Sequence, residues 1–135
     1  MTAEQLPPRY RHGLALREAC RAAFDQAGLD QATVTSNPLD IPSGAVHGVL
    51  VIAAPDLTFP TFDQYEEAFE GVAIAGPADN LAHAWLTLDR MVEALLQANL
   101  NLRDATADTF TPHGSLPLAG YAITFNPDTV YKETS

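Results

Sequence analysis

The stretch EGVAIAGPADNLAHAWLTLDRMVEALL, residues 70–96, is the most informative part of the sequence, because it predicts a strand followed directly by a helix. Val72 and Ile74 alternate with small residues, which places both on one face of a strand over 70–76. Apolar residues then recur at spacings of three and four, which predicts an amphipathic helix with one packing face. That face consists of Leu81, Trp85, Leu88, Val92, Leu95 and Leu96.

The residues before this stretch predict one more helix and two more strands. An extended lead-in over 1–8 precedes a helix over 10–27, which Gly28 ends because glycine readily adopts the left-handed conformation that closes helices. The β-branched content of 31–38 predicts a short strand. The almost continuously apolar run over 47–54 predicts a central strand, either with protein on both faces or with helices on one face and another subunit on the other.

The segment LTFPTFDQYEEAF, residues 57–69, is harder to assign. Pro60 cannot donate to a strand ladder, so a strand here would lie at an edge or contain a bulge. The polar residues 63–67 are flanked by two apolar segments, which indicates a hairpin with its turn in that polar middle.

The residues after the second helix predict two further strands. Apolar residues alternate over 100–105 and again over 117–126, and residues 113–115 supply a turn between the two segments. The polar residues 127–135 predict a frayed C-terminal tail.

The order of these elements predicts the fold class. Few of the connections are long enough to cross over between parallel strands, so we expect an α+β fold. The predicted architecture is one domain over 1–135, with a mostly antiparallel sheet of four to five strands and two helices packed on one face.

The charge of the chain limits its partners. The formal net charge is −10, which disfavours binding to nucleic acid or to an anionic membrane. Residues 1–24 nevertheless carry a net +2, because they hold four of the seven basic residues. Those arginines either cover a solvated helix face or meet the acidic part of a second copy.

The sequence predicts no catalytic, cofactor or metal site, and therefore no enzyme. The four histidines lack the short spacings of a zinc site, and GPADN at 76–80 lacks the glycines and lysine of a phosphate loop. Cys20 is expected to be a small core residue in a reducing compartment. The N-terminus has no apolar run typical of a signal peptide, and no segment is apolar enough to span a membrane.

Aromatic residues in a connection are the most unusual feature. Phe59, Phe62 and Tyr65 lie in or beside the segment that contains Pro60, and Phe69 follows closely. These rings either fold back onto the core of their own chain or form a contact patch for another protein.

Four segments together resemble the tail terminator proteins of long, non-contractile-tailed bacteriophages and their prophages. They occur in the order LREACRAAFDQAGL, APDLTFPTFD, VAIAGPADNLAHAWLTLDRMVEALL and LPLAGYAITF, and the likeness covers residues 9–127. Pro60 and the Pro7-Pro8 pair depart from the family pattern.

The resemblance implies an α+β virion protein that acts by assembly. Such proteins form a ring, typically of six subunits, at the head-proximal end of the tail tube, with assembly in the host cytoplasm. The ring stops polymerisation of the tail-tube protein and contacts the head-completion proteins, while DNA passes through without specific binding. An electronegative interior would favour that passage, because like charges remove the attraction to phosphate.

The expected subunit interface combines the aromatic segment with the basic N-terminus. Its candidate residues are Asp56, Leu57, Phe59, Phe62, Tyr65, Arg9, Arg11 and Arg17. Two alternatives stay open: another head-tail connector or tail-completion protein, and a small ligand-binding or enzymatic α+β domain whose aromatic residues line a pocket.

Overall fold

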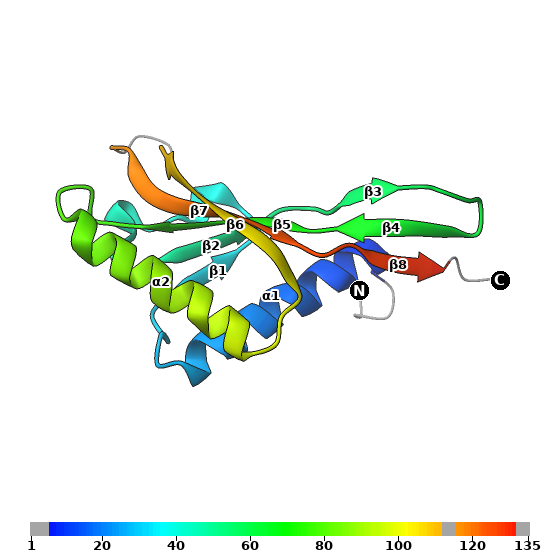
Figure 1. Cartoon of the computed structure of the whole chain (residues 1–135), viewed down its shortest axis with the longest axis horizontal. Helices are drawn as coiled ribbons and strands as arrows, with labels where there is room; N and C mark the ends of the chain where they lie inside the picture. Colours follow the sequence, from blue (N-terminus) through cyan, green and yellow to red (C-terminus); the bar gives the residue numbers. More distant parts are fainter. Residues whose placement is uncertain (1–5, 112–115, 132–135) are drawn as a thin grey trace.

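The computed structural model describes residues 6–111 and 116–131, and Figure 1 shows the order of its elements. The predicted turn at 113–115 lies outside the described residues. Two short 3-10 turns, Pro38–Asp40 and Ser43–Ala45, connect β1 (Thr33–Thr35) to β2 (Val49–Ile52). The helices and strands are α1 (Pro8–Gln26), β1 (Thr33–Thr35), β2 (Val49–Ile52), β3 (Asp56–Thr58), β4 (Gln64–Ala68), β5 (Glu70–Ala75), α2 (Leu81–Gln97), β6 (Leu102–Phe110), β7 (Leu118–Phe125) and β8 (Asp128–Tyr131).

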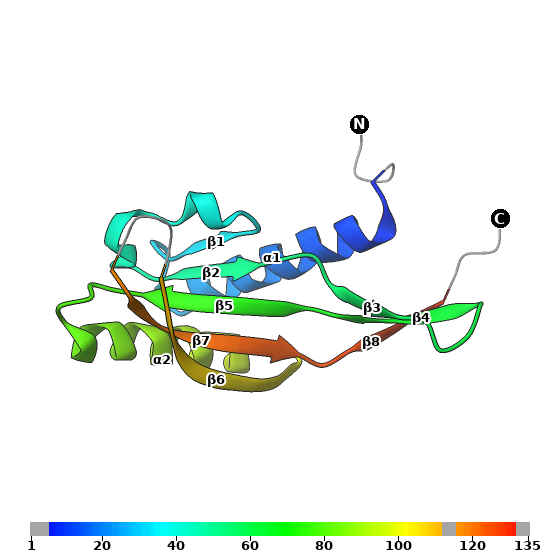
Figure 2. The ribbon, with the colours of Figure 1, turned by 90° about the horizontal axis from the view of Figure 1, so that it is seen from above.

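A five-stranded sheet forms the body, with its strands in the order β1-β2-β5-β7-β6. The strands of the pair β1–β2 are parallel, and the other three pairs are antiparallel. Both helices cover the same face of the sheet, as Figures 1 and 2 show from two directions. The predicted α+β class is therefore confirmed, with a mixed sheet that is antiparallel in all but one strand pair.

The main core lies between the sheet and the two helices. Phe24 of α1 and Leu88 of α2 are almost completely buried, and they pack with Leu50, Ile52 and Ile123 of the sheet. Trp85 adds an edge-to-face contact with Tyr121 of β7, with the ring centroids 5.5 Å apart. On the other face of the sheet, a smaller core is formed by Ala45, Val49, Ile74 and Leu118.

Helix α2 begins one residue after Asn80, whose side chain accepts a hydrogen bond of 3.2 Å from the backbone N–H of His83. Its packing face differs from the predicted stripe at both ends, because Leu81 and Leu96 are about half exposed. Small residues allow the helix to approach the sheet closely, so the buried face includes alanines that a count of large apolar residues misses. The buried residues of α2 are Ala84, Thr87, Leu88, Met91, Ala94 and Leu95.

A second sheet projects from the body as a narrow extension (Figures 1 and 2). Its strand order is β3-β4-β8. Each of these strands is joined to a neighbouring strand of the body, because β2 leads into β3, β4 leads into β5, and β7 leads into β8. Phe69 alone separates β4 from β5, and residues 126–127 separate β7 from β8. We call β3, β4, β8 and the connecting residues 59–63 the arm.

Two sequence-based expectations about this region are wrong. The hairpin turn lies at 59–63 instead of 63–67, because Gln64–Ala68 forms strand β4. Residues 128–131 form strand β8 against β4, so the predicted frayed tail is ordered at least that far. In both cases polar residues belong to a strand because their backbone pairs with a neighbouring strand, which is β3 and β8 for β4, and β4 for β8.

Candidate subunit-contact surface

The tip of the arm exposes two aromatic side chains. Phe62 is 87% exposed and Phe59 is 62% exposed, although the Phe59 ring lies 5.8 Å from the ring of Tyr65. The Thr61 hydroxyl donates a 2.6 Å hydrogen bond to Asp63, which orders the turn beside Phe62. Burying such a side chain stabilises a structure by about 1.5–3 kcal/mol, so the tip forgoes that gain in an isolated chain.

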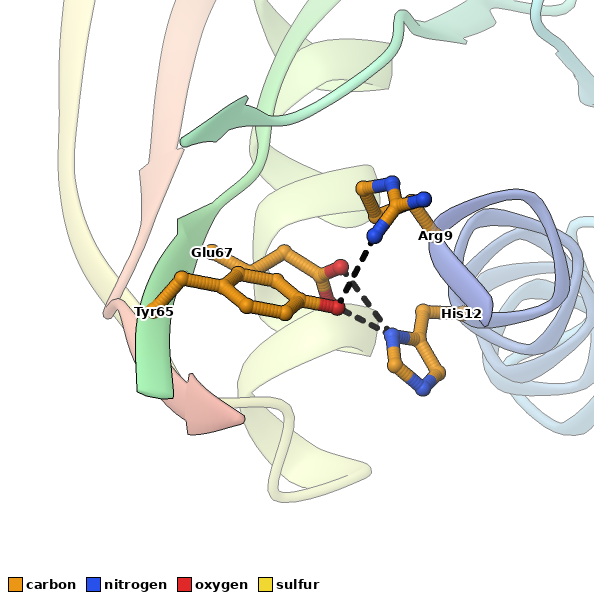
Figure 3. A network of polar contacts seen from close by, with 4 residues as sticks. All are labelled: Arg9, His12, Tyr65 and Glu67. Atoms are coloured by element: carbon orange, nitrogen blue, oxygen red, sulfur yellow. Dashed lines mark hydrogen bonds and ion pairs between the residues drawn. The ribbon is translucent and has the colours of Figure 1, made fainter. Parts of the chain in front are cut away.

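Polar contacts hold the base of the arm against the first turns of α1 (Figure 3). His12 Nδ1 lies 2.9 and 3.0 Å from the two carboxylate oxygens of Glu67. The Arg9 guanidinium donates a 3.3 Å hydrogen bond to the Tyr65 hydroxyl and lies 5.7 Å from the centroid of that ring. Glu67 is only 3% exposed, so the contact with His12 compensates for the hydrogen bonds to water that this carboxylate loses on burial.

Of the aromatic residues predicted either to fold onto the core or to form a contact patch, two do the first and two stay exposed. Tyr65 and Phe69 face α1 and are buried within their own chain, at 4% and 6% exposure. The expectation that Tyr65 is an exposed contact residue is therefore wrong, and its physical reason is the alternation of β4, which turns Tyr65 and Glu67 to the same face. Phe59 and Phe62 remain available, with Asp56 exposed and Leu57 half-buried on β3.

The three arginines predicted as interface residues lie together on α1. Arg9, Arg11 and Arg17 are half-buried, and no ion pair among residues 6–111 and 116–131 involves any of them. The Nε atom of Arg11 is buried without a hydrogen-bond partner in that part of the chain. Arginines without carboxylate partners are notable in a chain that has 17 acidic residues and seven basic ones.

A cleft of about 400 Å³ lies between α1 and the connection from β2 to β3. Arg9 and Arg17 line one side, and their aliphatic stems and charged groups border a mostly apolar floor. The sequence did not single out this floor, because it combines a helix face with a linker that lies far away in the chain. The floor includes Tyr10, Ala53, Ala54, Pro55 and Phe69.

Other reactive groups show no comparable arrangement. Burial raises the pKa of the Cys20 thiol from 9.0 to about 12, so this predicted core cysteine stays protonated at neutral pH. Among the residues that the structure describes, no group of three or more His, Cys, Asp or Glu side chains could hold a metal ion. None of the described helices is long and apolar enough to cross a membrane.

No protein-family model matches the sequence, and no curated protein matches it significantly.

Proposed function

We propose that this protein is a phage tail terminator, which acts as a ring of identical subunits and not through catalysis. In this role it caps the tail tube at its head-proximal end, stops addition of tail-tube protein and provides the surface for head-tail joining. The fold class agrees with the α+β fold that the sequence resemblance implies.

The observation that carries the proposal is the projecting arm with Phe59 and Phe62 exposed at its tip. A projection that presents large apolar rings to water is unfavourable in a lone chain, and it becomes favourable when another molecule covers the rings. The arm consists of strands that continue from the body sheet, so it holds the tip at a distance from its own core.

The charge distribution supports the same role. Between Arg21 and Arg90 the chain has no lysine or arginine, whereas the same segment holds ten acidic residues. A ring with acidic surfaces would let DNA pass without adhering to it, because phosphate is repelled.

A tube-capping assay tests this function. Tail-tube protein from the same genome is allowed to polymerise with and without this protein, and tube lengths are measured by electron microscopy. The wild-type chain is expected to shorten the tubes and to be found at one end. The variant Phe59→Ser with Phe62→Ser should leave tube length unaffected, because it removes the apolar contact while its fold is preserved.

The matched control is Leu39→Ser with Leu86→Ser, which removes exposed apolar side chains away from the arm. This control should cap tubes as the wild type does. A wild-type protein that neither binds nor shortens tubes would refute the tail-terminator proposal. If the variant without both phenylalanines still caps tubes, the exposed rings are not the contact surface and the proposal loses the observation that carries it.

A further inference from the structure

We propose that the arm tip of one copy inserts Phe62 into the cleft between α1 and the β2–β3 connection of a second copy. Arg9 and Arg17 of the receiving copy would then face Asp63 and Glu66 of the inserted arm. This contact would specify how neighbouring subunits of the proposed ring meet, and it rests on that proposed function.

The arm cannot fill the cleft of its own chain. Phe69 lies in the floor of that cleft, and strand β4 carries the chain from Phe69 out to the tip. Phe62 lies seven positions before Phe69, which corresponds to roughly 23 Å along an extended strand. The ring that fills the cleft must therefore come from another molecule.

The cleft suits an aromatic ring. Its volume is about 400 Å³, and roughly 150 Å³ of apolar cavity is enough to hold a benzene ring. Phe69 and Pro55 supply an apolar floor, and Tyr10 adds an aromatic edge. Arginine beside an aromatic ring gains a further cation–π attraction.

Charge complementarity selects the arm as the occupant. The exposed Asp63 and Glu66 flank the tip, while Arg9 and Arg17 have no carboxylate partner in the described part of their own chain. Bringing the two together forms charge-assisted hydrogen bonds that neither surface makes alone.

A second apolar cleft, on the sheet face opposite the helices, is a poorer receiver. It is lined by Val51, Val72 and Phe110 and has a volume of about 230 Å³. Asp104 and Asp108 lie on the same face of β6 as Phe110, so an acidic arm would meet like charge there.

The proposed contact joins two different surfaces, the tip of one copy and the cleft of the next. Such a head-to-tail contact generates a ring when the rotation between copies closes, and an open filament when it does not. Each copy both donates a tip and receives one, so a closed ring leaves no aromatic tip exposed.

Disulfide trapping tests the contact. A Thr61→Cys variant, which keeps Phe62, is mixed with an Ala54→Cys variant under mild oxidation, and one of the two carries an isotope label so that mass spectrometry identifies the linked peptides. Residues 54 and 61 are exposed in the wild type, so both variants should fold. The buried Cys20 thiol is fully inaccessible and should not exchange.

The control pair combines Thr61→Cys with Thr106→Cys on the exposed strand β6. Linkage to position 54 should exceed linkage to position 106 by at least about tenfold, because a specific contact raises the effective thiol concentration to about the millimolar range. Equal yields, or a predominance of links between two copies of position 61, would overturn the inference.

Charge reversal supplies a second readout of the same contact. Arg17→Glu in the copy with Ala54→Cys should lower the yield of the link, and Glu66→Arg in the copy with Thr61→Cys should restore it. Arg103→Glu, on β6, serves as the matched control and should leave the yield unchanged. An equal loss with both reversals would indicate a nonspecific charge effect and contradict the pairing.

The disulfide-trapping experiment tests the proposed contact, and the tube-capping assay tests the proposed function, so either proposal can be refuted without the other. If wild-type protein caps tubes and Phe62→Ser does not, but no link to position 54 forms, the cleft is not the receiver and the tail-terminator proposal survives. If the link forms but no tube is capped, the contact stands and the proposed function is wrong.

Discussion

His12 and Glu67 show how single residues fix the position of the arm. Glu67 is a buried carboxylate on β4, and His12 on α1 approaches both of its oxygens within 3.0 Å. This pair, with Arg9 and Tyr65, joins the arm to the helix that carries the receiving cleft. Tip and cleft are therefore held in a defined relation within each copy.

Replacing His12 should destabilise the fold. His12→Ala leaves Glu67 buried without its partner, which is expected to lower the free energy of unfolding by about 1–3 kcal/mol. The measurement is urea denaturation followed by circular dichroism. His83→Ala, at an exposed position of α2, is the matched control and should change stability by less than about 0.5 kcal/mol. An equal effect of both substitutions would show that the pair does not stabilise the arm base.

The sequence left open whether the aromatic residues around Pro60 fold onto the core or form a contact patch. Phe59 and Phe62 flank Pro60 in the turn of the arm, and the structure shows that both are exposed. Tyr65 could not be assigned correctly, because its burial depends on Arg9, which is 56 residues away. The pairing of Glu67 with His12 was missed for the same reason.

At the scale of elements, α2 shows what periodicity can and cannot predict. The helix spans Leu81–Gln97, and apolar spacing alone indicated its existence and its place against the sheet. The same spacing treated Leu88 and Leu96 as equivalent, but Leu88 is fully buried and Leu96 is 50% exposed. The difference is tertiary, since the sheet covers only part of the apolar surface.

This difference gives a direct prediction for helix packing. Leu88→Ala should lower the free energy of unfolding by about 2–5 kcal/mol, because it leaves a cavity in the main core. Leu96→Ala is the same chemical change on the same helix and should cost less than about 1 kcal/mol. Thermal or urea unfolding measures both. Similar losses for the two variants would mean that α2 does not pack through the face described above.

Strands were harder to predict than helices for a physical reason. The body strands β2, β5 and β7 are apolar enough to be recognised, but their continuations β3, β4 and β8 contain acidic residues on a solvated arm. Outside the buried face of Tyr65 and Glu67, that part of the fold is specified by backbone pairing with neighbouring strands. A polar segment that forms a strand only through such pairing has no local signature.

The whole molecule combines an apolar tip, an acidic arm and a basic helix on one small body. The net charge of −10 hides this division, because the arginines Arg9, Arg11 and Arg17 gather on α1 while the acidic residues dominate elsewhere. In a monomer the aromatic rings at the tip are exposed to water, and these arginines form no ion pair with a carboxylate among the described residues. Head-to-tail association satisfies both features with one contact.

Sedimentation velocity on the purified chain, across a wide range of concentration and with and without tail-tube protein, measures whether copies associate through the arm tip. We expect the 14.5 kDa chain to form a larger species, equal in mass to a closed ring of copies, and Phe62→Ser to abolish it. A wild-type chain that sediments as a monomer under every one of these conditions would contradict the claim that copies of this protein cover the arm tip of one another.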